Sequence, residues 1–542
     1  MMLTAVCAVL AILFTPTFAK SYEKFYVYWD SENGIQISTE KLPNVVYCCD
    51  GYFKENFNDD GWNKLYLHTY NVCTNREQAF AAGLAEAWVA FDDIYNHWYN
   101  TMNGMCENRT KLCQKIDLFY EQLEGLTVGY NFYQKNPERK LTFNDLLWLN
   151  IQGDIEELLD ALNSDEEEYE SFLVRGAKLP GSKSCSALVK LLPDSYDLYT
   201  SHDTWSSFQS MYKVMKNFQF EYNIIPTDNT TIPAASISFS SYPGVIQSGD
   251  DFYVTSTGLT VMETTIGNNN RSLWSYVNAE GQVLEQIRAL VATRLSTGGK
   301  QWSSIFSQYN SGTYNNQWMI VDYKLFKAGT PQKELKKDLL WVLEQLPGHI
   351  KAADKTDVLR EQSYWPSYNI PYFPEIFNLS DNQKLVEKYG DWFTYDKSPR
   401  ALIFKRDHVK VNDSSSMVAL MRYNDYKHDP LSKCNCTPPY SGENAIAARN
   451  DVNPANGTYP FAALGHRSHS ATDMKLTTSV LAPTLQFIAW SGPPYSDDLP
   501  PFQWSTSDYN HLAHLGQPDI WKFKPILFDW KKMQTKIHLK DF

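Results

Sequence analysis

The stretch GSKSCSALVKLLPDSYDLYTSHDTW, residues 181–205, places a cysteine at the start of one apolar segment and a histidine near the end of the next. The two segments are typical of antiparallel strands joined at Pro193-Asp194, because proline and aspartate are common turn residues. In the register in which the residues flanking this turn pair, Cys185 lies opposite His202, and opposed Cβ atoms are ~5 Å apart. The sequence therefore predicts a thiol and an imidazole at one end of a hairpin.

Three interpretations of this hairpin remain open on the residues alone. Cys185 is a core thiol, half of a disulfide, or a nucleophile. A histidine at a strand end, such as His202, is commonly a hydrogen-bonded structural residue. Whether the chain is an enzyme depends on which interpretation holds.

Composition limits the partners of the chain. Its 542 residues can bury a large core, and 20% charged with 14% aromatic residues indicates a globular protein rather than a disordered one. The formal net charge of -13, with no basic stripe, argues against a nucleic-acid partner.

The first residues, MMLTAVCAVLAILFTPTFAK, indicate a signal peptide over 1–19, cleaved before Lys20. The apolar run Leu3–Phe14 is too short to span a bilayer, and no later segment is apolar enough to do so. We therefore expect a glycosylated protein of the secretory pathway, secreted or lysosomal. Seven Asn-x-Ser/Thr sites support this expectation: Asn108, Asn229, Asn270, Asn378, Asn412, Asn435 and Asn456.

Cysteine usage is consistent with an oxidising compartment, because eight cysteines remain after Cys7 is removed with the signal. We expect Cys106 to pair with Cys113, and Cys434 to pair with Cys436. Cys73 can take either Cys48 or Cys49. If Cys185 is not in a disulfide, one thiol of that adjacent pair is left over.

Hydrophobic periodicity predicts strands, then helices, then mostly strands. Residues 20–60 alternate as strands do, and 75–165 have helical spacing, with Thr142 as a helix start. After residue 185 short strands dominate, and the last 140 residues are rich in loops. Further elements are expected as a processing loop at 176–184, helices at 272–297 and 332–346, and a strand pair at 316–326. This order favours a layered α+β protein.

Several common catalytic motifs are absent. The chain has no G-x-S-x-G, H-E-x-x-H, C-x-x-C or G-x-G-x-x-G, so serine-lipase, zincin and dinucleotide-binding interpretations have no support. Three short clusters that contain histidine, at 428–430, 465–470 and 511–514, have no compact set of carboxylate or thiol ligands beside them. We therefore expect no metal site and no cofactor.

Four longer segments resemble the phospholipase B-like family, a branch of the N-terminal nucleophile hydrolases. They are KSCSALVKLLPDSYDLYTSHDTW (183–205), PSYNIPYFPEIFNLS (366–380), SPRALIFKRD (398–407) and MRYNDYKHDPLSKCNC (421–436). The resemblance implies an αββα four-layer sandwich and self-cleavage between Ser184 and Cys185. A light fragment, 20–184, and a heavy fragment, 185–542, would then stay associated as one globular unit.

The resemblance also implies roles for single residues. Cys185 would be the nucleophile, with its own new α-amine as the base, because ordinary pKa values of about 7.7–8.0 for the amine and about 8.5 for the thiol make proton exchange easy. His202 would tune the nucleophile or hold substrate. Asn369 would stabilise the oxyanion, Arg400 would support the thiolate or bind an anionic headgroup, and Trp205 would form a pocket wall. Asp203 and Asp429 are weaker candidates that we leave out of the set.

The expected activity is hydrolysis of fatty-acyl ester bonds in phospholipids. One alternative is an amidase acting on N-acylated lipids or peptides, and a second is a lipid-binding glycoprotein without catalysis. All three imply a lipid or acyl-amide ligand and at most transient contact with a membrane surface.

Overall fold

Two large β-sheets organise the protein. The computed structural model describes residues 23–30, 34–101, 117–162, 184–224, 230–278 and 280–532. All neighbours in the first sheet are antiparallel except β4 and β7, which are parallel. In spatial order its eleven strands are β13 (His349–Asp354), β12 (Leu340–Leu346), β11 (Asn316–Asp322), β10 (Leu259–Thr265), β9 (Phe252–Thr255), β8 (Ser236–Ser241), β7 (Val214–Gln219), β4 (Asn63–Thr69), β3 (Val46–Lys54), β1 (Glu23–Asp30) and β2 (Gly34–Ser38).

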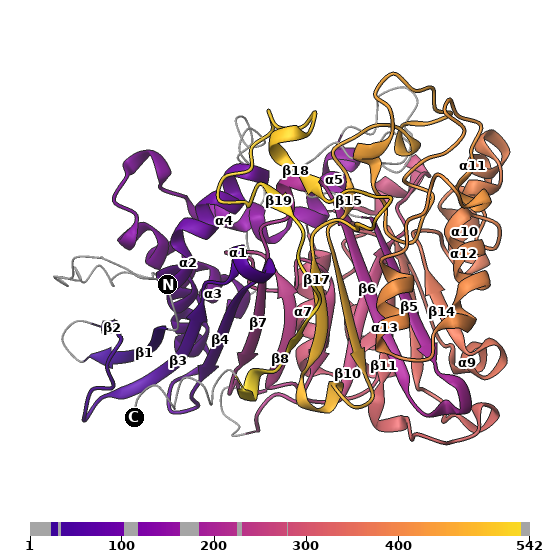
Figure 1. The fold of residues 1–542 in the computed structure, drawn as a ribbon. Coiled ribbons are helices and arrows are strands. Elements are labelled where there is room, and N and C mark those ends of the chain that lie inside the picture. The colour runs from indigo at the N-terminus through magenta and orange to yellow at the C-terminus, as the bar shows by residue number, and fades with distance from the viewer. Residues whose placement is uncertain are drawn as a thin grey trace.

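The second sheet has seven strands and carries the hairpin that begins at Ser184. Figure 1 shows β5, β6 and β17 in front of the first sheet. The strands are β14 (Tyr364–Ser367), β5 (Ser184–Leu191), β6 (Leu198–Ser206), β16 (Asp473–Thr478), β17 (Phe487–Ser491) and β20 (Ile526–Phe528), with β15 (Ser470–Ala471) beside β6.

Apolar side chains pack between the two sheets and on the outer face of each sheet. Between the sheets, Val189 of β5 shares a cluster with Met262 of β10 and Met319 of β11. The other face of the first sheet packs on α2 (Asn75–Thr101), α3 (Asp117–Tyr133), α4 (Phe143–Asn150), α5 (Gln152–Leu162), α7 (Glu285–Leu295) and α8 (Gly299–Phe306). The outer face of the second sheet packs on α12 (Pro399–Asp407) and α13 (Ser414–Met421). The result is a mixed α/β architecture with helices outside the paired sheets.

Shorter elements complete the chain. They are α1 (Phe57–Asp60), α9 (Thr356–Gln362), α10 (Pro374–Leu379), α11 (Asn382–Tyr389), and the two-stranded sheet of β18 (Phe502–Gln503) and β19 (Ile520–Trp521). Much of the last quarter consists of turns and loops, as expected. Thr142 begins α4 through a capping box with Asp145, which confirms the expected helix start.

The register predicted for the hairpin is wrong by two residues. Cys185 pairs with Thr204, and His202 pairs with Ala187. The connection is longer than a two-residue turn because Asp194 and its successor both adopt left-handed backbone angles, with φ of 53° and 50°. A shift of two residues keeps every side chain on the same face. Cys185 and His202 therefore still lie on one side of the sheet, diagonally rather than directly opposed.

Three predicted elements are wrong or only partly right. The segment 332–346 is a 3₁₀ turn followed by β12, not a helix, because two strand neighbours are available for it. The segment 316–326 is the single strand β11, which ends where the Asp322 side chain accepts from Lys324 N. The helix expected over 272–297 begins only at Glu285, after Gly281 with φ of 73°.

Two disulfides are present in the described residues. Cys434 bonds to Cys436 as expected, and Cys73 takes Cys48, which leaves Cys49 as the buried thiol. Of the sequons, Asn378, Asn412, Asn435 and Asn456 are exposed, and Asn270 is half-buried with its amide donating to Leu379 O. The signal peptide, residues 176–183 of the expected processing loop, Cys106, Cys113, Asn108 and Asn229 lie outside the described residues. Ser184, the last residue of that expected loop, instead begins β5.

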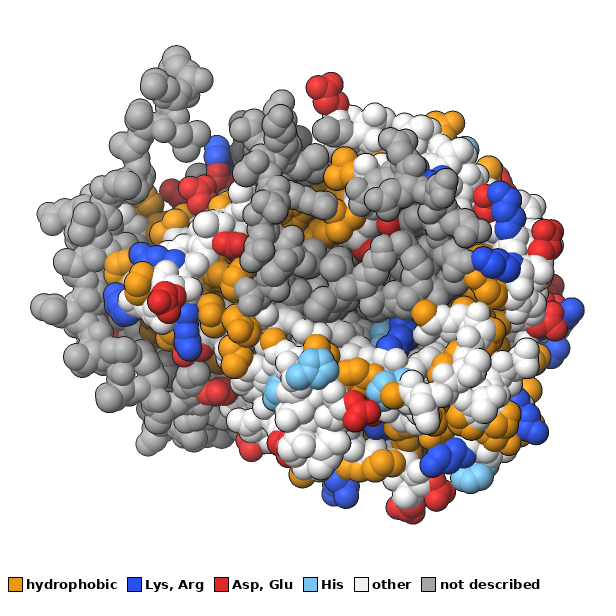
Figure 2. Space-filling model, turned by 90° about the horizontal axis from the view of Figure 1, so that it is seen from above, with side chains coloured by type: hydrophobic (Ala, Val, Ile, Leu, Met, Phe, Trp, Pro, Cys, Tyr) orange, Lys and Arg blue, Asp and Glu red, His pale blue; other side chains and the backbone are white. Residues whose placement is uncertain are grey.

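Segments on both sides of residue 185 share one sheet, since β4 pairs with β7 along six residue pairs. Among the described helices, none has the length and apolarity to cross a bilayer. On the face in Figure 2, acidic and basic side chains are interspersed over the described surface.

The reassignment of residues 332–346 can be tested with a buried side chain of β12. Leu343 is fully buried against the helical layer, so Leu343→Ala should lower the free energy of unfolding by about 2–5 kcal/mol. Lys337→Ala, at an exposed position just upstream, should change it by less than about 0.5 kcal/mol. Denaturant unfolding measures both variants, and equal effects would contradict the assignment.

Candidate active site

Cys185 lies where the hydrogen-bond ladder between β14 and β5 ends. The last pair of that ladder is Ser367 with Ala187, so β14 does not reach the backbone of Cys185. Two side chains take the place of the missing strand. Asn369 Oδ1 accepts from Cys185 N at 3.1 Å, and Arg400 Nη1 donates to Cys185 O at 2.6 Å. The side chain of Cys185 is fully buried, and its sulfur is in neither of the two described disulfides.

The orientation of the Asn369 amide is fixed by its other contacts. Its Nδ2 donates to Thr265 O at 2.7 Å, which turns Oδ1 toward Cys185 N and Arg400 Nη1. Asn369 has a φ of 67°, a left-handed conformation that asparagine tolerates better than most residues. In the intact chain Asn369 therefore offers an acceptor to residue 185, rather than the donor expected for an oxyanion site.

Arg400 connects the cysteine to a buried aromatic ring. Its guanidinium carbon lies 4.3 Å from the ring centroid of Trp205, which is fully buried. Burial lowers the pKa of Arg400 to about 10, so the guanidinium stays charged at neutral and acidic pH. Trp205 does not line the pocket beside Cys185. Trp205 instead supports Arg400, and its ring also packs against His469.

His202 lies close to the thiol. The Cys185 sulfur, a ring nitrogen of His202 and a carboxylate oxygen of Glu263 all lie within 4.8 Å of one another. His202 Nε2 is 2.8 Å from the backbone carbonyl of Glu263, so Nε2 carries the proton and Nδ1 remains an acceptor. Burial and the Lys475 ammonium lower the pKa of His202 well below its usual range. The imidazole is therefore neutral beside the thiol.

A buried ionic network surrounds this histidine. Lys475 Nζ donates to Thr204 Oγ1 at 2.6 Å and to Asp473 Oδ1 at 2.7 Å. Lys213 Nζ donates to Asp473 Oδ2 at 2.6 Å and to Asp250 Oδ1 at 3.0 Å. Because Thr204 is the strand partner of Cys185, the network holds the residue facing the thiol.

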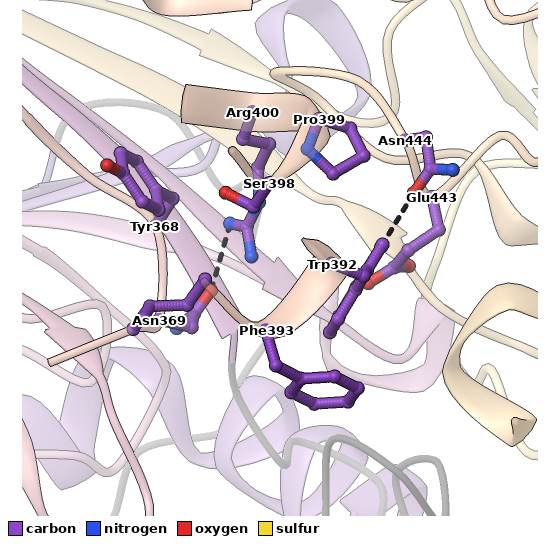
Figure 3. A pocket seen from close by; sticks show the side chains of 10 residues that line it. Tyr368, Asn369, Trp392, Phe393, Ser398, Pro399, Arg400, Glu443 and Asn444 are labelled. Carbon is purple, nitrogen blue, oxygen red and sulfur yellow. Dashed lines mark hydrogen bonds between the residues drawn. The ribbon is translucent and has the colours of Figure 1, made fainter. Parts of the chain in front are cut away.

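A pocket opens next to the backbone partners of Cys185, and Figure 3 shows Arg400 and Asn369 at one side of it and Trp392 across from them. Trp392 Nε1 donates to Asn444 Oδ1 at 2.8 Å, which fixes the indole. The lining residues are Tyr368, Asn369, Ile370, Trp392, Phe393, Ser398, Pro399, Arg400, Glu443 and Asn444. The pocket combines aromatic walls with a few polar groups, as small-molecule sites do.

The set of Cys185, His202 and Glu263 also has the donor types that Zn²⁺ accepts. It was not expected from sequence, because its members are far apart in the chain. Within the described residues, none of the three histidine clusters noted in the sequence forms such a group. Of the weaker candidates, Asp429 pairs with Arg406 at 2.8 Å, and Asp203 points to the face of β6 opposite His202.

Four residues around the site were not predicted from the sequence: Glu263, Tyr314, Glu443 and Glu344. Tyr314 Oη donates to Asp251 Oδ2 at 2.6 Å and approaches Glu263 Oε1 at 3.2 Å. Glu344 of β12 accepts from the backbone of residues 372 and 373, at 2.6 and 3.1 Å. It thereby anchors the loop that carries Asn369. The available signal was an acidic residue inside a strand segment, and it was clearest for Glu344, which lies in the largely apolar strand β12.

Replacement of Glu344 should change how stability depends on pH. Burial raises the pKa of Glu344 to about 7. The unfolded chain loses this proton near 4.5, so the stability contribution is complete below that pH and is lost as pH rises through 7. Glu344→Gln cannot ionise, so relative to the parent it should gain up to roughly 3 kcal/mol between pH 4.5 and 8. Denaturant unfolding across this range measures the difference.

Glu375→Gln is the matched control, because Glu375 is an exposed residue of α10. Its stability curve should run parallel to that of the parent. If the Glu344→Gln curve is parallel as well, the carboxyl is not held in its protonated form.

Comparison with known proteins places the chain in a family. The family model described as phospholipase B matches residues 49–117 and 111–528. A protein of Bos taurus named as phospholipase B-like 2 is 46% identical over 506 residues, covering 87% of this chain and 84% of its own. A Caenorhabditis elegans protein named as phospholipase B-like 1 is 42% identical over 517 residues, covering 89% and 87%.

Among solved structures, a conjugated bile acid hydrolase of Clostridium perfringens matches 57% of this chain and 89% of its own. Its sequence identity is 11% and its TM-score is 0.31. The family match and the relatives carry the assignment without it: this chain belongs to the phospholipase B family.

Proposed function

We propose that the protein is a hydrolase of fatty-acyl bonds, with phospholipid esters as its substrates and Cys185 as an N-terminal nucleophile. Scission between Ser184 and Cys185 would activate it. The observation that carries the proposal is the hydrogen bond that Cys185 N donates to Asn369 Oδ1, beside a pocket lined by Arg400. The helices outside the paired sheets support an αββα four-layer sandwich of the N-terminal nucleophile type.

The scission step uses only the chain and one water. Cys185 Sγ attacks the carbonyl carbon of Ser184, the C–N bond breaks, and its nitrogen becomes the α-amine of Cys185. Water then cleaves the resulting thioester, giving a carboxylate on Ser184 and restoring the thiol. Ser184 and Cys185 are both buried in β5, which keeps the reacting groups in one conformation.

The new amine would be the base for substrate hydrolysis. It occupies the position of Cys185 N, so it can donate to Asn369 Oδ1 and accept the thiol proton. We assign Asn369 to positioning of this amine, because its Nδ2 already donates to Thr265 O. Arg400 holds the carbonyl of Cys185, and His202, whose pKa is lowered well below its usual range, stays neutral beside the thiol.

Two expectations about context belong to the same proposal. Exposed sequons and a disulfide near the surface suit a glycosylated protein of the secretory pathway, secreted or lysosomal. The pairing of β4 with β7 supports light and heavy fragments that stay associated after scission. Access to lipid would need transient contact with a membrane surface.

Amide hydrolysis is the second candidate activity, since the same nucleophile can cleave N-acylated lipids or peptides. The polar side chains that line the pocket support this second activity. A lipid-binding glycoprotein without turnover is the non-enzymatic alternative.

Scission at residue 185 is tested by end analysis of the purified protein. The heavy fragment should begin Cys185-Ser186-Ala187, and Cys185→Ala should remain one chain with no measurable hydrolysis, because it lacks the attacking sulfur. Intact mass and N-terminal sequencing measure the first outcome, and assays on phospholipid and acyl-amide substrates the second. Cys49→Ala is the control, since Cys49 is the other buried thiol. Full hydrolysis by Cys185→Ala would refute the proposal.

Removal of the Asn369 side chain should slow turnover more than it weakens binding. Asn369→Gly keeps the left-handed backbone free of strain and removes the acceptor for the amine. We expect kcat of the cleaved enzyme to fall about 10–100-fold with KM nearly unchanged. Asn369→Asp keeps an acceptor and adds charge, so its pH profile should move to higher pH. An unchanged kcat in Asn369→Gly would exclude the positioning role.

A further inference from the structure

Glu443 lines the pocket beside Cys185. One oxygen of its carboxylate accepts a hydrogen bond from a described residue, and the other accepts none. Its Oε2 accepts from Arg467 Nη2 at 3.0 Å and lies 3.9 Å from His469 Nδ1. Its Oε1 is buried, and no described residue donates to it. Glu443 is only 2% exposed, and it lines the pocket together with Trp392 (Figure 3). A buried carboxylate oxygen without a donor is costly unless a ligand supplies one.

Ser398 gives the same pocket a second polar atom of this kind. It precedes α12, but its side chain does not cap the helix. Its Oγ is buried and has no hydrogen-bond partner among the described residues. A hydroxyl can donate or accept, whereas a carboxylate oxygen can only accept. The pocket therefore matches a group that gives one hydrogen bond and receives another.

The charges around the pocket oppose a cationic ligand. Glu443 is the acidic residue of the lining, and Arg400 lines it too, while Arg467 binds the same carboxylate. These three groups sum to a net positive charge. The rest of the lining includes the aromatic rings of Trp392 and Phe393. A positively charged trimethylammonium group does not suit such surroundings, but a neutral amide or hydroxyl does.

We propose that Glu443 Oε1 and Ser398 Oγ determine specificity by binding a neutral substrate group that both donates and accepts a hydrogen bond. A secondary amide and a hydroxyl share this chemistry, and a fully substituted ester does not. The inference rests on the proposed acyl-hydrolase function and names the polar group its substrate carries next to the acyl chain. Trp392 and Phe393 supply the apolar walls for the rest of the ligand.

Two matched pairs of ligands test this in the intact Cys185→Ala chain, where turnover cannot interfere. The amide pair is N-lauroylglycine and O-lauroylglycolate, which differ by N–H against O. The hydroxyl pair is lauroyl lysophosphatidylcholine and its methyl ether at the free hydroxyl. By titration calorimetry below micelle formation, the donor-bearing member of at least one pair should bind about tenfold more tightly. Which pair shows the preference identifies the source of the donor.

Glu443→Gln provides a readout that a structural role would not give. Because Arg467 donates to one atom of the side chain, the glutamine oxygen faces Arg467 and its NH₂ takes the place of Oε1. The acceptor in the pocket becomes a donor, so the preference should invert toward the ester or the ether. Ser398→Ala should weaken the preference about threefold. Arg467→Ala removes the partner of Oε2 without changing the lining, and it should keep the preference.

Melting temperatures of the variants verify folding, and Ser398→Ala serves as the second test if Glu443→Gln does not fold. Equal affinities within both pairs, or no binding of any of the four ligands, would overturn the inference. So would a preference that survives Glu443→Gln. These outcomes are separate from the nucleophile test, because binding requires no sulfur: hydrolysis by Cys185→Ala would remove the proposed function and leave the recognition pair in place.

Discussion

The rest of the site depends on how the backbone of Cys185 is held at the end of a β-ladder. Within a sheet, both the N–H and the C=O of a residue normally bond to neighbouring strands. On the β14 side of Cys185 two side chains replace that neighbour, Asn369 for the N–H and Arg400 for the C=O. A side-chain acceptor leaves room around the nitrogen that a continuous strand would fill. The nitrogen can therefore become a free amine without loss of its partner or disturbance of β5.

Buried charged side chains between the two sheets also position the surroundings of Cys185. Lys213 and Lys475 share Asp473, and Lys475 also holds Thr204 opposite the thiol. Two buried ammonium groups are sustained only because their hydrogen bonds are satisfied. Burial, together with the positive field of these lysines, lowers the pKa of His202 well below its usual range. The neutral imidazole is compatible with the proposed role of a free α-amine at residue 185 as the base.

How much could be predicted from sequence differs between local and long-range features. Thr142 and the hairpin strands were readable because helix capping and apolar segments bounded by turn residues are local signals. The hairpin register failed because two consecutive left-handed residues after Pro193 cannot be inferred from a Pro-Asp pair. The segment 332–346 failed because its apolar spacing fits a helix as well as a strand, and β11 and β13 decide between them. Cys185, Asn369 and Arg400 came from the family resemblance, whereas Glu443 needed the fold, since nothing in the sequence places it near Cys185.

Buried carboxyl and imidazole groups change the stability of the fold in opposite directions as pH changes. Together they set the pH range in which the fold is most stable. Burial raises the pKa of Glu157 to about 8 and of Glu344 to about 7, so their contributions to stability are lost as pH rises through those values. Burial lowers the pKa of His202 and His469 well below the usual range. The unfolded chain gains those two protons below about 6.5, so stability falls as pH drops further. The two effects together favour weakly acidic conditions, in which both carboxyls stay protonated and both imidazoles stay neutral.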